Sequence, residues 1–155
     1  DADPLDIAPL LATLGQPDDA LYPPLWEPMR FDKPVGVGAS GTHGIISAYA
    51  PGSLIEITFP SGTGITGTHT FTVTGLGPGR SLARHDVDAQ ATPIAWLAWK
   101  TIIAPAHDPI LEELLDRLQC AVGTPPATPA KLSTYARLLR WFDRARTRPE
   151  EPRCP

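Results

Sequence analysis

The chain has 155 residues and a formal net charge of −4, so we expect one domain with a real core and no general affinity for nucleic acid. No apolar run is long enough to span a bilayer, and no secretory signal pattern is present. The chain has only two cysteines, Cys120 and Cys154, without metal-ligand spacing and with one of them beside the C-terminus. We therefore expect no disulfide framework and a reducing, cytoplasmic compartment. The chain begins with Asp rather than Met, so we expect that its N-terminus was processed or trimmed.

The first predicted helix follows Asp3, a typical N-cap, with Pro4 at the first helical position. It carries apolar residues at helical spacing and ends at Gly15. Residues 16–34 contain many prolines and predict an extended connection, in which Trp26 is a candidate pocket lid. The stretch GVGASGTHG (36–44) lacks the Gly-Lys-Ser/Thr ending of a P-loop, so we interpret it as flexible strand entry or a pocket-rim loop.

Residues 44–87 alternate between apolar and polar side chains, which predicts a curved antiparallel sheet of four strands. The first hairpin turns around residues 51–52. One face of this hairpin then carries Ile46, Ala48, Ile55 and Ile57, while Ser47, Glu56 and Thr58 take the other face. Continuing the count through the next loop places Phe59 near His69 and Ile57 near Phe71.

The second hairpin contains two of the four histidines. If Gly75–Gly79 form the loop, His69 lies directly opposite His85, with the two Cβ atoms about 4.5–5.5 Å apart. Both rings then point toward the C-terminal helix, on a face shared with Phe71, Val73 and Val87. A register shift of one residue would put the two rings on opposite faces instead.

Two helices are predicted after the sheet. The first begins at Thr92-Pro93 and is apolar nearly all round, so we expect it to be buried until Pro105 interrupts it. Asp108-Pro109 offers a second N-cap for a helix that ends at Gly123. The apolar stripe of this second helix consists of Leu111, Leu114, Leu115, Leu118 and Val122.

A proline-rich linker leads to a last helix, from about Ala130 to Arg146. Its apolar stripe consists of Leu132, Tyr135, Leu138, Leu139 and Phe142. Residues 124–155 contain seven Lys or Arg and three acidic residues, a net charge of +4 that contrasts with the acidic remainder. Such a helix can lie on an anionic membrane or on a partner, but we favour docking onto the chain's own acidic domain. We therefore divide the chain into a domain (1–123) and a linker with a basic amphipathic helix (124–155).

Six stretches together resemble an actinobacterial branch of the SRPBCC superfamily, which includes START-like lipid-transfer domains and polyketide cyclases. They are DADP, MRFDKPVGVGASGTHG, AYAPGS, GTHTFTV, RSLARHDV and HDPILEELLDRL, and the resemblance covers roughly residues 1–123. It implies an α+β helix-grip fold, in which a curved antiparallel sheet wraps around a long C-terminal helix and leaves a cavity. The chain begins where the family's usual first strand should end, and residues 124–155 have no counterpart in the shared core.

His69 and His85 match histidines that recur at these places in similar sequences. They could hold a metal, act as acid and base, contact a ligand, or form hydrogen bonds within the core. A zinc site needs three or four ligands, and neither His43 nor His107 is an obvious third, so we predict no metal and no cofactor. His107 stands at the predicted mouth, where helix meets sheet. Trp96 and Trp99 either line a cavity or fill the core.

We therefore expect the chain to bind a small apolar or aromatic ligand between sheet and C-terminal helix, with no nucleic-acid or membrane partner. The rival function is an enzyme of the polyketide cyclase or aromatase type that uses His69 or His85 as acid or base. Asp86 and Asp88 point to the other face and give these histidines no acidic partner. A third possibility is an interaction module recruited through the basic helix. The predicted ligand-binding residues are Ile57, Phe59, His69, Phe71, Val73, His85, Val87, Trp96, Trp99, His107, Leu111, Leu114 and Leu118.

Overall fold

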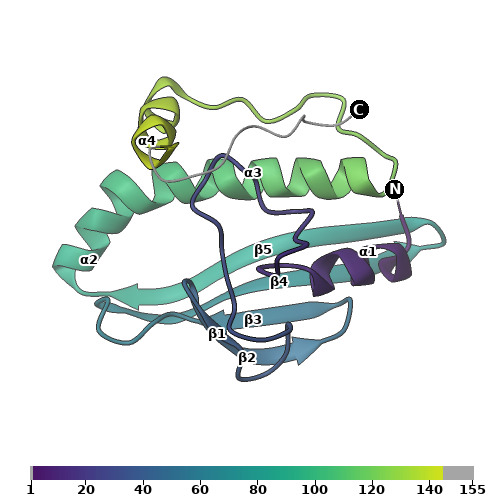
Figure 1. Cartoon of the computed structure of the whole chain (residues 1–155), viewed down its shortest axis with the longest axis horizontal. Helices are drawn as coiled ribbons and strands as arrows, with labels where there is room; N and C mark the ends of the chain where they lie inside the picture. Colours follow the sequence, from purple (N-terminus) through teal and green to yellow (C-terminus); the bar gives the residue numbers. More distant parts are fainter. Residues whose placement is uncertain (1, 145–155) are drawn as a thin grey trace.

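The computed structural model describes residues 2–144, which form an α+β fold with a five-stranded antiparallel sheet (Figure 1). Each strand pairs with the next one in sequence: β1 (Ser40–Gly41), β2 (Gly44–Ala50), β3 (Leu54–Thr58), β4 (Ile65–Gly77) and β5 (Arg80–Ala91). The helices are α1 (Pro4–Ala12), α2 (Pro93–Ala98), the π-helical turn η1 (Trp99–Ile103), α3 (Ala104–Ala121) and α4 (Thr134–Arg144). Within residues 2–144, none of these helices combines the length and apolar character that crossing a bilayer requires.

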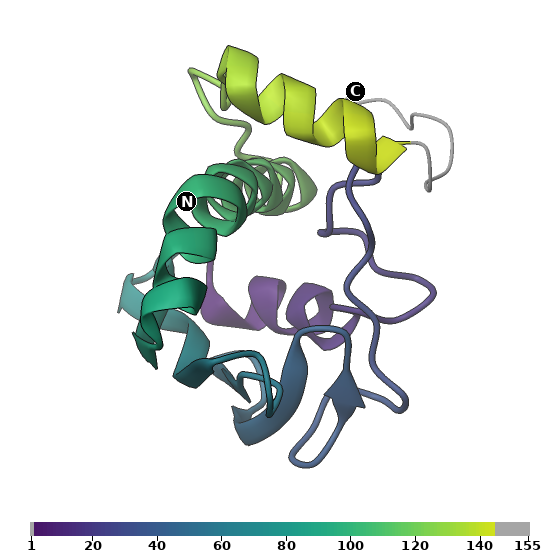
Figure 2. The ribbon, with the colours of Figure 1, turned by 90° about the vertical axis from the view of Figure 1, so that its left-hand side faces the viewer.

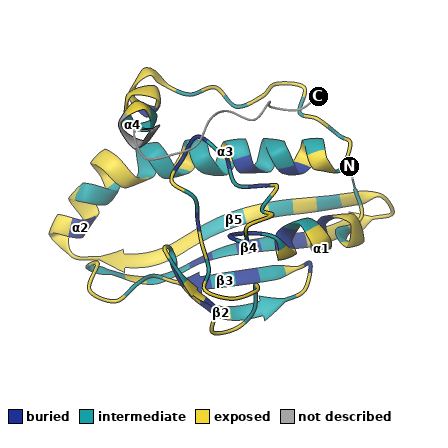
Figure 3. Cartoon of the chain, in the orientation of Figure 1, coloured by how far each residue is buried: buried dark blue, intermediate teal, exposed yellow. Residues whose placement is uncertain are grey.

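The core lies between the inward face of the sheet, α1 and α3. Figure 2 shows α3 above the sheet, with α1 and the connection that follows it along the side between them. Figure 3 shows buried positions on α1, β3 and α3, whereas α2 and the adjoining end of β5 are mostly exposed. The buried cluster includes Ile7, Leu11, Leu14, Ile46, Ile55, Ile57, Phe71, Val73, Leu114 and Leu118.

The β4–β5 hairpin has a register two residues away from the predicted one. A two-residue turn at 78–79 and a bulge at Leu76 replace the predicted five-residue loop. His69 therefore lies opposite Val87 and His85 lies opposite Phe71, so the predicted direct opposition of the two histidines is wrong. Because the shift is an even number of residues, both imidazoles still occupy the inward face.

A bulge in β2 also changes the first hairpin. Ile46 pairs with Ile57 on the buried face as predicted, but the register shifts before Ala48, which lies opposite Glu56. The prediction that Ala48 shares the inward face is therefore wrong, because one extra residue reverses the facing of every later side chain. Ser47 does lie beside Glu56, and its hydroxyl donates to the Glu56 carboxylate at 2.8 Å.

The helical segment after β5 runs without interruption from α2 through η1 into α3, and this corrects two predictions. Pro105 does not break the helix, and Asp108 is not an N-cap, because α3 already begins at Ala104. A proline has no N–H to give to the carbonyl four residues earlier. Here a wide π-helical turn precedes the proline, and the Tyr135 hydroxyl donates to the Thr101 carbonyl at 2.7 Å.

The start of α2 is as predicted, but its burial is not. The Thr92 hydroxyl accepts a hydrogen bond from the Ala95 N–H at 3.3 Å and so caps the helix. Ala95 is buried, whereas the large apolar side chains Ile94, Trp96, Leu97 and Ile102 are exposed. The prediction of a buried helix is wrong because β3 pairs with β4 only over residues 68–72, so the β4–β5 ribbon extends beyond the rest of the sheet before α2 begins.

The last helix docks onto the same chain, as favoured from its charge. Arg140 and Glu113 form an ion pair at 2.9 Å, with side chains only 12% and 13% exposed. Ala136 is fully buried, and Leu139 is half-buried. Leu138, predicted to belong to the apolar stripe, is about half exposed instead, so the helix is rotated relative to the predicted face.

Helix α4 begins at Thr134 rather than at Ala130, since residues 125–133 remain irregular. The predicted end at Arg146 and the predicted contact of the Phe142 side chain lie outside the described residues. Cys120, near the end of α3, is disulfide-bonded, which corrects the expectation drawn from the cysteine count. A disulfide removes the argument for a reducing compartment. Cys154 lies outside the described residues.

Candidate functional site

The four histidines of the chain come together in a row along the inward face of the sheet. His43 lies in the β1–β2 turn, His69 on β4, His85 on β5 and His107 on α3. Successive ring centroids in this row are 6.3, 5.5 and 5.3 Å apart. The sequence predicted His69, His85 and His107 as site residues, and the fold adds His43 at the other end of the row.

His69 and His85 form the closest contact of the row. Nδ1 of His69 and Nε2 of His85 are 3.2 Å apart, so one ring donates a proton and the other accepts it. The His69 side chain is only 4% exposed. Its Nε2 atom is buried and has no hydrogen-bond partner in the described part of the chain.

All four imidazoles have lowered pKa values, chiefly because burial disfavours the charged form. The pKa is about 4 for His43, about 4 for His69 and about 3 for His85. Repulsion from neighbouring histidines lowers these three pKa values further. Burial also lowers the pKa of His107, although Asp108 opposes that shift. The row is therefore uncharged near neutral pH.

Three aromatic rings lie against members of the row. Phe59 lies 5.1 Å from His69, Phe71 lies 4.4 Å from His85, and Trp99 lies 5.6 Å from His107, measured between ring centroids. The structure thus brings together six of the predicted ligand-binding residues: Phe59, His69, Phe71, His85, Trp99 and His107.

The remaining predicted site residues are not part of this ring cluster, although Ile57 and Val87 pair with His69 from the two neighbouring strands. Ile57, Val73, Leu114 and Leu118 are buried members of the packed core, and Leu111 packs against that core. Val87 is 40% exposed and Trp96 is 55% exposed. Residues 2–144 contain no group of three or more His, Cys, Asp or Glu side chains arranged to hold a metal ion.

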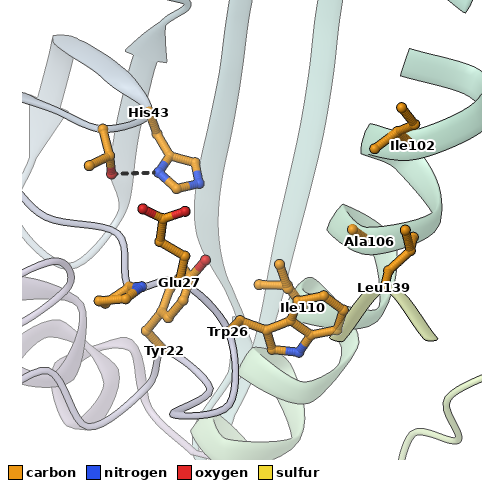
Figure 4. A pocket seen from close by; sticks show the side chains of 10 residues that line it. Tyr22, Trp26, Glu27, His43, Ile102, Ala106, Ile110 and Leu139 are labelled. Carbon is orange, nitrogen blue, oxygen red and sulfur yellow. Dashed lines mark hydrogen bonds between the residues drawn. The ribbon is translucent and has the colours of Figure 1, made fainter. Parts of the chain in front are cut away.

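A cleft of about 700 Å³ opens beside the outer end of the row, at His43. Figure 4 shows helical side chains on one side of the cleft, the proline-rich connection and His43 on the other, and Trp26 next to Ile110. The lining residues are Tyr22, Trp26, Glu27, Pro28, Thr42, His43, Ile102, Ala106, Ile110 and Leu139. None of the thirteen predicted ligand-binding residues is among them.

Two signals in the sequence point to this cleft. Ile102, Ala106 and Ile110 are spaced four residues apart and form a helical stripe beside the predicted leucine stripe of the same helix. Trp26, the candidate lid, does line the cleft; it is only 3% exposed, and its indole Nε1 is buried without a hydrogen-bond partner in residues 2–144. The connection and the helix are far apart in sequence, so the sequence alone did not show that they lie close together.

The β1–β2 turn holds His43 firmly at the cleft wall. Thr42 donates its backbone N–H to the Arg30 carbonyl at 3.1 Å, and the Arg30 N–H donates to the Thr42 hydroxyl at 3.2 Å. On the other side, a Cβ atom on Gly44 would overlap the carbonyl oxygen of Thr58, so the two backbones approach closely. Gly44 therefore allows the residue after His43 to lie directly against the backbone of β3, and the interpretation of this stretch as a pocket rim stays a prediction.

Comparison with known proteins finds no match. No family model matches the chain, and neither does a curated protein or a solved structure. The resemblance to the SRPBCC superfamily stays a prediction.

Proposed function

We propose that this protein binds a small apolar or aromatic molecule in the cleft between the proline-rich connection, the β1–β2 turn and the η1–α3 helix. The observation that carries the proposal is the cleft itself, since its volume of about 700 Å³ suits a small organic ligand. Its walls are largely aliphatic and aromatic, with a few polar groups from Tyr22, Glu27, Thr42 and His43. Such a wall favours an apolar body with few hydrogen-bonding atoms.

The histidine row supports binding better than acid–base chemistry. With pKa values of about 4 and about 3, His69 and His85 are weak bases near neutral pH. His69 is only 4% exposed and does not line the cleft. The histidine row is better suited to form an uncharged surface next to a binding cleft.

The resemblance of residues 1–123 to the SRPBCC superfamily supports the same proposal. In a helix-grip arrangement, α3 would be the gripped helix and the sheet would wrap toward it. The cleft lies on α3 at one edge of the sheet, displaced from the centre that the sequence favoured, where Ile57, Phe71, Leu114 and Leu118 pack together.

Filling the cleft tests the proposal. The neutral fluorescent probe N-phenyl-1-naphthylamine is titrated into the wild-type protein, Ala106→Trp and Ala121→Trp. Ala106 lines the cleft, whereas Ala121 is an exposed residue of the same helix and provides a matched control. We expect the probe to bind wild type and Ala121→Trp equally, and Ala106→Trp about tenfold more weakly, or 1.4 kcal/mol. Equal affinity for all three proteins, or no binding to wild type, would overturn the proposal.

A further inference from the structure

The hydrogen bonds around His43 determine which of its nitrogens can face a ligand. Nδ1 of His43 lies 3.0 Å from the Thr42 hydroxyl oxygen. That hydroxyl already accepts the backbone N–H of Arg30 at 3.2 Å. The oxygen has a second lone pair, but the proton of the hydroxyl has no other acceptor in residues 2–144, so we assign this proton to the contact, with Nδ1 of His43 as the acceptor.

A neutral imidazole carries one proton, so an accepting Nδ1 leaves the proton on Nε2. Burial keeps the ring neutral near pH 7, since the pKa of His43 is about 4. Nδ1 faces the Thr42 hydroxyl, and Figure 4 shows the other ring nitrogen of His43 turned toward the open side of the cleft. The cleft wall thus presents one oriented, uncharged N–H donor.

We propose that His43 is a specificity-determining residue whose Nε2–H donates a hydrogen bond to an uncharged acceptor oxygen, such as a ketone carbonyl, on an aromatic ligand. The inference rests on the proposed binding function and names the ligand class. Thr42 acts as a positioning residue, because its hydroxyl sets which nitrogen carries the proton. A neutral N–H donor in a largely apolar cleft offers no opposite charge to an anionic oxygen, so an uncharged acceptor fits this place better.

The proton position can be measured without any ligand. A long-range ¹H–¹⁵N correlation spectrum at pH 7 distinguishes a ring protonated on Nε2 from one protonated on Nδ1. We expect His43 to carry the proton on Nε2 in wild type and to lose that preference in Thr42→Val, which has nearly the same shape without the hydroxyl. A wild-type ring protonated on Nδ1 overturns the inference.

Binding specificity is measured with two neutral naphthalene probes that differ in one carbonyl. 6-Propionyl-2-(dimethylamino)naphthalene carries the ketone, and 6-propyl-2-(dimethylamino)naphthalene has a methylene group in place of the carbonyl. We expect wild type to prefer the ketone by about five- to tenfold, the usual size of one net hydrogen bond. His43→Phe keeps an aromatic ring but should lose the preference, while His43→Gln, which retains an N–H donor, should recover part of it.

The outcomes separate this inference from the binding proposal. If both probes bind, Ala106→Trp weakens both, and His43→Phe leaves the ketone preference unchanged, then the cleft binds ligands but His43 does not select them. If neither probe binds wild type, both proposals fail. Circular dichroism and thermal unfolding of each variant establish that the comparison is made between folded proteins, and the spectrum of wild type decides the proton position even where a variant does not fold.

Discussion

Lowering the pH from 7.5 to 5 should cost about 2 kcal/mol of folding free energy through His69 alone. The folded protein holds the pKa of this histidine at about 4, against 6.5 for an unperturbed side chain, chiefly by burial. Between these two values the unfolded chain binds a proton that the folded chain does not. Stability is therefore complete above pH 6.5, falls as the pH drops toward 4, and levels off below the folded-state pKa.

The assay is urea unfolding followed by circular dichroism at pH 7.5 and pH 5, for wild type and His69→Leu. The variant loses the hydrogen bond to His85 and should be less stable at both pH values. Between pH 7.5 and pH 5, however, the free energy of unfolding of His69→Leu should fall by about 2 kcal/mol less than that of wild type, because the titrating group is gone.

Ile57→Val is the matched control, since Ile57 lies directly opposite His69 on β3. Removing one buried methylene should lower stability by about 1 kcal/mol at both pH values without changing the pH dependence. If His69→Leu loses as much free energy on acidification as wild type does, burial of His69 is not what makes the fold acid-sensitive.

Three further substitutions test how the fold is held. Gly44→Ala should lower the free energy of unfolding by more than about 2 kcal/mol, because φ is +129° and a Cβ would overlap the Thr58 carbonyl; a smaller loss in urea unfolding would contradict the close approach. Tyr135→Phe should weaken the docking of α4 by about 1 kcal/mol, seen as faster amide exchange in α4 alone; unchanged exchange would mean that its bond to Thr101 contributes nothing. Leu114→Ala should cost about 2–5 kcal/mol of stability, and a loss below about 1 kcal/mol would show that this helix position is not packed.

The identity of β2 to β5, and the facing of their side chains where no bulge intervenes, could be predicted from local pattern, but register could not. Alternation along β4 correctly put His69, Phe71 and Val73 on the inward face. The exact partner of His69 depended on whether Gly75–Gly79 closed as a loop or as a two-residue turn with a bulge. Glycine-rich sequences permit both, so the local sequence contains too little information to choose.

The candidate cleft was harder to foresee, because its walls are separated by about eighty residues and meet only through tertiary packing. Trp26 and the rim loop were recognised as candidates, yet nothing in the connection indicates that it lies against Ile102 and Ile110. The prediction that Pro105 interrupts the helix was wrong for a related reason. A proline usually ends a helix, and here a π-helical turn together with a hydroxyl from a distant helix allows it to continue.

The contacts of the N-terminus have a consequence for the order of folding. All five strands pair with their sequence neighbours, so the sheet needs only short loops to close. Helix α1, by contrast, is joined to the β4–β5 turn by a bond from the Gly79 N–H to Asp3 and by one from the Ser81 hydroxyl to the Ala2 carbonyl, across 76 and 79 residues. Because long-range closure is entropically costly, we expect α1 to dock after the hairpins have formed. Substituting Asp3 by Ala should then accelerate unfolding and leave the refolding rate nearly unchanged; a slower refolding rate would place this contact in the folding nucleus.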